Sequence, residues 1–307
     1  MGYDKARLRF PGGPLLERVL GRMEQVASPV VLSLAAGQAP PALSDARAGK
    51  VIVVRDSDAD QGPLQGLLEG FRALARQCAR VVVMPVDMPF FTEDCLRRLL
   101  AGLEGHMACQ MEHEGFVNAL TAAYDLSLLE RLEGLVAEGL RRPVFLSEGQ
   151  PTRVIEAETP PRGGHPMQDV DTPESYREAL LEEGVGEAGG ADVTVIVDTV
   201  APDTVAPDTV AMDTVQGERD FIALHAHTAA GVMNALQNLY PELQMGFPPC
   251  SGGLMLFGLE GRESGDDPGL FIQADLIAGS RTPLPPETPM RPGQSLALIM
   301  PAESSSA

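Results

Sequence analysis

The chain has 307 residues and a formal net charge of −20, with 43 acidic residues against 23 basic ones. This length favours two domains over one core, and the charge disfavours a nucleic acid or an anionic membrane as the main partner. No apolar run is long enough to span a bilayer, the amino terminus has no export pattern, and the four cysteines are scattered. We therefore expect a cytosolic protein with reduced thiols.

Up to about residue 185, short apolar runs alternate with apolar residues at helical spacing. The short runs predict strands that are buried on both faces, at 30–34, 51–54 and 81–84. The helical spacing predicts helices at 14–27, 63–79, 92–104 and 126–139. Such alternation is typical of an α/β fold with a doubly wound, mostly parallel sheet.

A change in composition divides the chain near residue 185. Residues 186–190 are rich in glycine and predict a linker, and residues 198–217 contain a five-residue repeat that predicts a solvated loop. Apolar runs predict strands at 193–197, 221–224, 253–259, 271–276 and 296–300, and Thr228 precedes a helical pattern. Two strands, a helix and further strands predict a small α+β domain over 191–307.

Asp87 follows the apolar run at 81–84 and precedes a proline at position 89. This places its carboxylate at the carboxyl end of a strand, where open α/β sheets bind their ligands. A carboxylate there suits Mg²⁺, which shares its shell with phosphates and water. Aspartate also ends many strands simply because it starts turns. Asp56, after another strand, and Asp171 add further carboxylates.

Four segments in order carry a family resemblance. Residues 1–16 contain Gly-Tyr-Asp-Lys-Ala and a glycine turn before Pro-Leu-Leu, and residues 56–67 contain Asp followed by Gly-Pro-Leu-Gln-Gly-Leu. Residues 86–90 read Val-Asp-Met-Pro-Phe, and residues 169–174 read Asp-Val-Asp-Thr-Pro-Glu. Together they resemble the nucleotide-binding elements of molybdenum cofactor guanylyltransferases, over most of residues 1–185. The resemblance implies a Rossmann-like domain that transfers GMP from Mg-GTP to molybdopterin and releases pyrophosphate.

The same resemblance implies roles for single residues. Lys5 would reach the triphosphate, and Asp87 would hold the Mg²⁺ that bridges the phosphates; both would be catalytic. Asp56 would contact the guanine nucleotide, and Gly62 would let the backbone approach the substrate or shape a turn. Asp171 would be a second carboxylate beside the metal or a helix cap. Nucleotidyl transfer depends mainly on positioning and charge neutralisation, which these residue types supply.

The family's Leu-Ala-Gly-Gly-x-Ser-x-Arg stretch would precede Met1. We therefore expect residues 1–185 to lack the first central strand and the loop whose N–H groups grip the triphosphate. A misplaced start codon or a truncated gene product would account for this difference. An in-frame Gly-Gly-x-Ser-x-Arg upstream of Met1 would favour the misplaced start.

The second domain has a resemblance of its own. Residues 228–243 and 290–301 are similar to the helix and the final turn and strand of the small sulfur-carrier subunit of molybdopterin synthase, which implies a MoaD/ThiS-like β-grasp domain. The tail at 302–307 has no Gly-Gly, so we expect no sulfur-carrier chemistry from it and a docking role toward other proteins of the same pathway.

Alternatives remain open at this stage. The chain could transfer CMP, or use another phosphorylated acceptor, on the same fold. It could also be a non-catalytic scaffold or binding protein. The basic pair Arg141-Arg142 follows a helix, so it could complement the helix dipole or meet the phosphate of the pterin.

Overall fold

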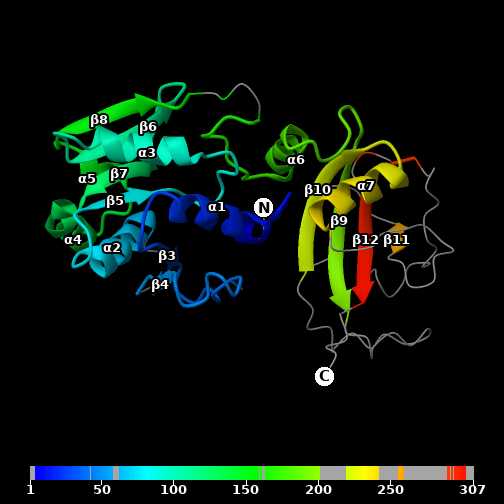
Figure 1. Ribbon diagram of the computed structural model, residues 1–307, viewed down its shortest axis with the longest axis horizontal. Coiled ribbons are helices and arrows are strands. Elements are labelled where there is room, and N and C mark those ends of the chain that lie inside the picture. Colours follow the sequence, from blue (N-terminus) through cyan, green and yellow to red (C-terminus); the bar gives the residue numbers. More distant parts are fainter. Residues whose placement is uncertain are drawn as a thin grey trace. The chain divides into compact units, whose positions relative to one another are not determined.

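The computed structural model describes residues 4–41, 43–57, 62–158, 160, 163–200, 219–241, 255–258, 289–290, 292 and 294–301. The chain divides into two compact units, Leu16–Asp169 and Met1–Leu15 together with Val170–Ala307. Figure 1 labels the elements of both units. The division falls after Asp169 instead of after residue 185, because helix α6 (Pro173–Glu182) packs against strand β10 (Arg219–Ala226).

The unit Leu16–Asp169 contains two hydrogen-bonded sheets. In the smaller sheet, β3 (Val31–Leu34) runs parallel to β4 (Ile52–Arg55). The larger sheet has the order β5-β7-β6-β8, and its strands are Arg80–Val83 (β5), Ala108–His113 (β6), Phe116–Asp125 (β7) and Thr152–Glu156 (β8). Strand β7 is antiparallel to β5 and to β6, whereas β8 is parallel to β6.

The prediction of an α/β fold is confirmed, but the larger sheet is mixed instead of mostly parallel. The reason is a tight hairpin between β6 and β7, at Glu114 and Gly115, whose φ angles are 50° and 80°. Two consecutive residues with positive φ form the turn that matches the twist of antiparallel strands. This hairpin places β7 between β5 and β6.

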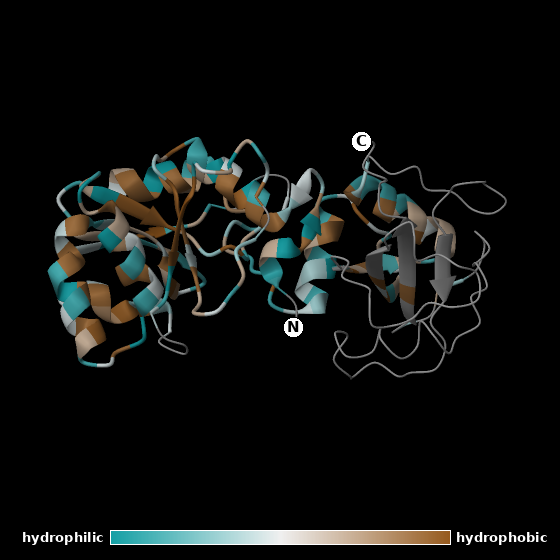
Figure 2. Ribbon diagram, turned by 90° about the horizontal axis from the view of Figure 1, so that it is seen from below, coloured by the Kyte–Doolittle hydropathy of each residue, from teal (hydrophilic) through white to brown (hydrophobic). Residues whose placement is uncertain are grey.

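Helices cover the larger sheet on both faces, as a doubly wound fold requires. The helices of this unit are α1 (Leu15–Glu24), α2 (Pro63–Leu74), α3 (Glu93–Gly102), α4 (Leu129–Ala137) and the short α5 (Val144–Ser147). Adjacent residues of β7 enter different clusters: Tyr124 packs with leucines of α2 and α4, and Ala123 packs with leucines of α3. Figure 2 shows the hydrophobic strands between helices that are hydrophobic on one side.

The smaller sheet departs from the prediction of strands buried on both faces. Val53 in β4 is exposed, and the burial of β4 alternates along the strand. Helix α2 packs on β3 and β4, and alternation of this kind is typical of a sheet with one solvated face. The expected helix at 126–139 begins as a 3-10 turn at Leu126–Leu128 and continues as α4.

The second unit contains a four-stranded sheet with the order β10-β9-β12-β11. Strands β9 (Ala191–Val200) and β10 are antiparallel, β12 (Gln294–Pro301) is parallel to β9, and β11 (Met255–Gly258) is antiparallel to β12. Helix α7 (Ala229–Leu239) packs on β10, with Thr228 as its cap. These elements match the predicted strands, except that 271–276, most of the repeat and the tail lie outside the described residues.

The amino-terminal segment belongs to this second unit. It consists of a 3-10 turn at Lys5–Arg7 and the short paired strands β1 (Arg9–Phe10) and β2 (Gly13–Pro14). The residues predicted as a linker are held against β10, since Glu187 N donates to His225 O at 2.8 Å and Glu187 Oε2 accepts from His227 N at 2.6 Å. In the described part of the chain, no helix is both long and apolar enough to cross a membrane.

Candidate functional site

Asp87 lies in the turn that follows β5, and neighbouring residues fix this turn. Met88, Phe90 and Phe91 are buried directly after it. Arg22 of α1 donates to the carbonyl oxygen of Pro89 at 2.6 Å and to that of Phe91 at 2.8 Å. The half-buried carboxylate of Asp87 therefore lies at the end of a strand in a turn with an anchored backbone.

Asp56 follows β4, and its backbone N donates to Leu34 O at 3.0 Å. Its Oδ1 is buried and, among the described residues, has no hydrogen-bond partner. Burial, and then the negative charge of Glu69, raise the pKa of this carboxyl group. A buried carboxylate oxygen without a donor costs free energy, and a bound ligand that donates a hydrogen bond would remove that cost.

Gly66 explains how α2 comes close to Asp56. A Cβ atom at position 66 would lie 3.0 Å from Ser33 Oγ and 3.6 Å from Asp56 Oδ1. Glycine therefore lets the first turn of α2 approach the ends of β3 and β4. This supports a packing role for Gly66.

Gly62 caps the start of α2 with φ 77° and ψ 175°, and Pro63 is the first helical residue. A Cβ at position 62 would lie 3.0 Å from Arg141 Cβ, and Leu64 N donates to Arg141 O at 3.3 Å. The backbone at Gly62 thus packs directly on the segment that carries Arg141 and Arg142. Glycine is required here both by the positive φ and by this close approach.

A cavity of about 530 Å³ lies beside this segment. Its walls include Met88, which follows Asp87 in sequence, and the hairpin residues His113, Phe116 and Val117. Arg141 and Arg142 also line it. Phe116 is 80% exposed, and Val117 beside it is 46% exposed. The carboxylates of Glu114 and Asp169 also line the cavity.

The arginines that line the cavity favour an anionic ligand. Neither Arg141 nor Arg142 has an ion pair or a side-chain hydrogen bond within the described residues, so two guanidinium groups are available to an anion. The ring of His113 stacks on that of His165 with centroids 3.6 Å apart. Burial, and then the charge of His113, lower the pKa of His165, which favours a neutral ring.

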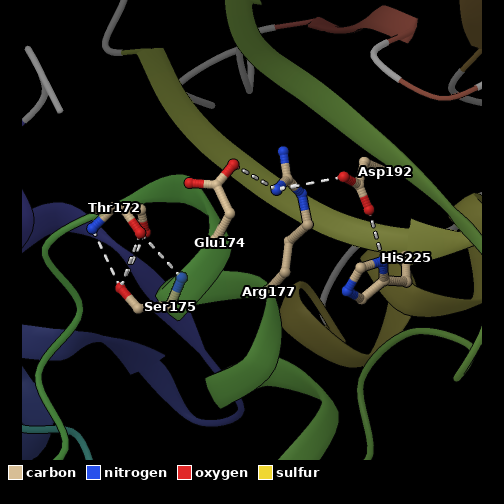
Figure 3. Close-up of polar contacts among 6 residues, drawn as sticks. All are labelled: Thr172, Glu174, Ser175, Arg177, Asp192 and His225. Carbon is tan, nitrogen blue, oxygen red and sulfur yellow. Dashed lines mark hydrogen bonds and ion pairs between the residues drawn. The ribbon is translucent and has the colours of Figure 1, made fainter.

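Lys5 and Asp171 are brought together within the second unit, although 166 positions separate them in sequence. Lys5 Nζ forms an ion pair with Asp171 Oδ1. Asp171 does not cap α6, because Thr172 does: Thr172 Oγ1 accepts from Ser175 N at 3.1 Å, and Thr172 N donates to Ser175 Oγ at 3.1 Å (Figure 3). Of the predicted site residues, Asp56, Gly62 and Asp87 belong to the other unit.

The sequence interpretation missed Arg22, Phe116 and Val117. The Glu114-Gly115 pair between apolar residues was the available signal for the hairpin that carries Phe116 and Val117. Arg22 carried no signal, because its partners are main-chain carbonyl groups distant in sequence. Among the described residues, no group of three or more His, Cys, Asp or Glu side chains could hold a metal ion by itself.

The sequence is similar to those of known proteins. Residues 1–152 match the MobA-like NTP transferase domain. The chain is 36% identical over 166 residues to a probable molybdenum cofactor guanylyltransferase of Mycobacterium ulcerans, covering 52% of this chain and 80% of that protein. It is 33% identical over 169 residues to the corresponding protein of Mycobacterium tuberculosis, with the same coverage.

The chain belongs to the molybdenum cofactor guanylyltransferase family. Among solved structures, it is similar to molybdopterin-guanine dinucleotide biosynthesis protein A from Archaeoglobus fulgidus. The identity is 20% and the TM-score 0.42, over 59% of this chain and 90% of that one. Family membership concerns the nucleotidyltransferase half, since the matched residues lie there.

Proposed function

We propose that this guanylyltransferase family member transfers GMP from Mg-GTP to molybdopterin and releases pyrophosphate. The observation that carries the proposal is the 36% identity to a probable molybdenum cofactor guanylyltransferase across 80% of its length. The anchored turn that carries the half-buried Asp87 supports it, since a carboxylate after a strand end lies where open α/β sheets bind their ligands.

Asp87 is the proposed Mg²⁺ ligand. Carboxylate oxygens suit this hard cation, and a site with few protein ligands leaves room for phosphate oxygens and water. When bound, Mg²⁺ neutralises charge that develops on the phosphates. The anchored turn keeps the Asp87 carboxylate oriented toward it.

Lys5, Asp56 and Gly62 are the proposed nucleotide-binding residues. Lys5 would exchange its pairing with Asp171 for the triphosphate, because a polyphosphate offers a lysine more negative charge than one carboxylate. Asp56 would accept hydrogen bonds from the guanine nucleotide through its carboxylate. Gly62 would let the backbone at the start of α2 lie close to the substrate.

The acceptor would occupy the cavity beside Arg141 and Arg142. Two guanidinium groups without partners among the described residues are suited to a terminal phosphate. The exposed Phe116 and Val117 offer apolar surface for a flat heterocycle.

Residues 191–307 form the proposed β-grasp domain. The β9–β10 hairpin, the following helix α7 and the parallel placement of β12 beside β9 support this assignment. The buried face of α7 contains Val232, Leu236 and Leu239. A docking role toward other molybdenum cofactor pathway proteins follows as part of the proposal.

The direct test is nucleotide transfer by the protein with Mg²⁺, molybdopterin and GTP, CTP or ATP labelled on the α-phosphate. We expect a dinucleotide product and pyrophosphate with GTP only. A site that hydrogen-bonds one base rejects others strongly, because the wrong base leaves buried polar groups unpaired. Product formation with CTP at a rate equal to that with GTP would contradict guanylyl transfer. The absence of product with all three nucleotides would contradict the enzyme assignment.

A further inference from the structure

We infer that the carboxyl-terminal sheet and α7 hold the segment that carries Lys5, and so position this lysine for the nucleotide. The inference rests on the proposed function of Lys5. In this inference, the carboxyl-terminal domain positions a residue of its own chain. The positioning residues are Asp220 of β10 and Tyr240 at the end of α7, which together form the Asp220–Tyr240 anchor.

The anchor binds Arg9 from two directions. Arg9 Nε donates to Asp220 Oδ2 at 2.9 Å, and the guanidinium carbon of Arg9 lies 4.6 Å from the centre of the Tyr240 ring. Tyr240 OH donates to the same Asp220 Oδ2 at 2.8 Å. Arg7 adds a weaker ion pair, with Nη2 at 3.6 Å from Asp220 Oδ1. The Tyr240 ring fixes the distance of the Arg9 guanidinium group, and the carboxylate of Asp220, which binds both side chains, fixes its orientation.

The anchor is shielded from water, which distinguishes it from an ordinary surface ion pair. Tyr240 is 1% exposed, and the side chains of Asp220 and Arg9 are 18% and 26% exposed. Burial, and then the charge of Asp220, raise the pKa of Tyr240 well above its usual range, so its hydroxyl remains a donor at neutral pH. Exposed ion pairs contribute little, whereas partly desolvated networks are stronger and more specific.

Helix α6 holds the same segment from another side. Tyr176 OH donates to Arg9 O at 2.5 Å, and the Tyr176 ring meets the Phe10 ring edge-on with centroids 5.5 Å apart. Phe10 is fully buried. The backbone at Arg9 and Phe10 is thus fixed by α6, while the Arg9 side chain is fixed by the anchor.

Helix α6 is itself tied to the carboxyl-terminal sheet (Figure 3). Arg177 Nη1 lies 3.8 Å from Asp192 Oδ2, and Asp192 Oδ1 lies 2.9 Å from His225 Nδ1. These contacts join α6 to β9 and β10. Asp171, the partner of Lys5, directly precedes the capped start of this helix, so both members of the pair are carried by segments that the sheet holds.

One short turn connects the anchor to Lys5. Leu8, fully buried, lies between Arg9 and the 3-10 turn, and its N donates to Lys5 O at 3.1 Å. Displacement of the Arg9 backbone would therefore also displace the backbone of Lys5. Small misplacements of groups that contact substrate can cost on the order of a hundredfold in rate, so loss of the anchor should affect nucleotide binding without any direct contact.

The chain offers a direct readout, because it contains only two lysines, Lys5 and Lys50. Lys50 is exposed in the other unit and serves as an internal reference. Brief reductive methylation followed by mass spectrometry gives the ratio of labelling at Lys5 to that at Lys50. The full chain is labelled without nucleotide and over a range of Mg-GTP concentrations, below the onset of thermal unfolding.

Four variants separate positioning from general stability. Asp220→Ala removes the anchor carboxylate, Asp220→Glu restores the charge, and Tyr240→Phe removes one hydroxyl while keeping the ring. Glu133→Ala is the matched control, because it removes the carboxylate of an exposed pair, Arg72 Nη2 to Glu133 Oε1 at 3.0 Å, in the other unit. Tyr240→Phe also covers the case in which Asp220→Ala does not fold.

For Asp220→Ala we expect a severalfold higher labelling ratio without nucleotide. The Mg-GTP concentration that half-protects Lys5 should rise about tenfold or more, within the range that misplacement of a binding group costs. Asp220→Glu should partly restore both values, Tyr240→Phe should shift them in the same direction by less, and Glu133→Ala should leave them unchanged.

Unchanged ratios and unchanged half-protection in folded Asp220→Ala and Tyr240→Phe would overturn the anchor proposal. If Mg-GTP does not protect Lys5 in the unaltered protein, the proposed role of Lys5 fails, and the positioning inference fails with it. A change in the nucleotide-free ratio would then still report the physical link between the anchor and Lys5. The two failures are therefore distinguishable.

Discussion

Gly62→Ala should destabilise the unit Leu16–Asp169 by about 2–4 kcal/mol. Gly62 has φ 77° and ψ 175°, a backbone conformation that is nearly restricted to glycine. An alanine there costs about 1–3 kcal/mol in backbone strain. Its Cβ would also lie 3.0 Å from Arg141 Cβ and 3.3 Å from Arg141 O. That carbonyl accepts from Leu64 N, so the neighbouring backbone cannot retreat without loss of a hydrogen bond.

Gly70→Ala is the matched control, because it makes the same change in the same helix. Gly70 lies inside α2, and a Cβ at this position would meet no atom within 4 Å. Replacing an unstrained helical glycine by alanine stabilises by about 0.5–1 kcal/mol, mainly by reducing the freedom of the unfolded chain. The two variants should therefore change stability in opposite directions.

Urea unfolding followed by far-ultraviolet circular dichroism measures both changes, and the absence of tryptophan makes this a better probe than fluorescence. The free energy follows from the midpoint and the slope of the transition. If Gly62→Ala is as stable as Gly70→Ala, within about half a kcal/mol, then neither the backbone conformation at Gly62 nor its contact with Arg141 has been interpreted correctly.

Three further predictions follow from the site and the core. Asp87→Asn should abolish GMP transfer and leave the melting temperature unchanged. The control variant Asp45→Asn, at an exposed position, should keep its activity. A fully active Asp87→Asn protein would show that Asp87 is only a turn residue. Asp56→Asn should raise the melting temperature at neutral pH, because burial and then Glu69 raise the pKa of Asp56 in the folded state and its ionised form is costly there. The gain should vanish below about pH 4, where the carboxyl group is protonated in both states, and an equal gain at both pH values would refute this cause. Tyr124→Phe should cost about 1–2 kcal/mol in urea unfolding, since Tyr124 OH donates to Ala119 O at 2.6 Å and accepts from Gln110 Nε2 at 3.3 Å. Burial raises the pKa of Tyr124 to about 12, so the unaltered protein should lose stability as pH rises from about 10 to 12, and Tyr124→Phe should show no such additional loss.

Local signals in the sequence determined where the helices begin. Thr92 accepts from Cys95 N, Thr172 forms a capping box with Ser175, and Thr228 accepts from Gly231 N. The first helical residue after Gly62 is a proline, as its fixed φ favours. A cap depends on groups within three or four residues, so its signal is complete in the sequence. The apolar strands at 31–34 and 80–83 were predictable for the same reason, because a short run of branched residues favours a strand by itself.

The order and direction of strands depended on the tertiary structure. Strand β7 lies between β5 and β6 and is antiparallel to both, which the apolar pattern did not indicate. The direction in which a strand pairs is selected by turns and by packing partners that are distant in sequence. The division after Asp169 has the same origin, since α6 buries its face against β10 and thereby joins the carboxyl-terminal unit.

The sequence predicted some features of the candidate site, and only the tertiary structure showed the others. Asp87 could be selected from its place after an apolar strand, whereas Asp56, Gly62 and Lys5 were selected because their segments resemble those of a known family. The pairing of Lys5 with Asp171 and the hold of Asp220 and Tyr240 on Arg9 could not be predicted. These contacts join residues more than 160 positions apart, and only the folding of the whole unit brings their side chains within bonding distance.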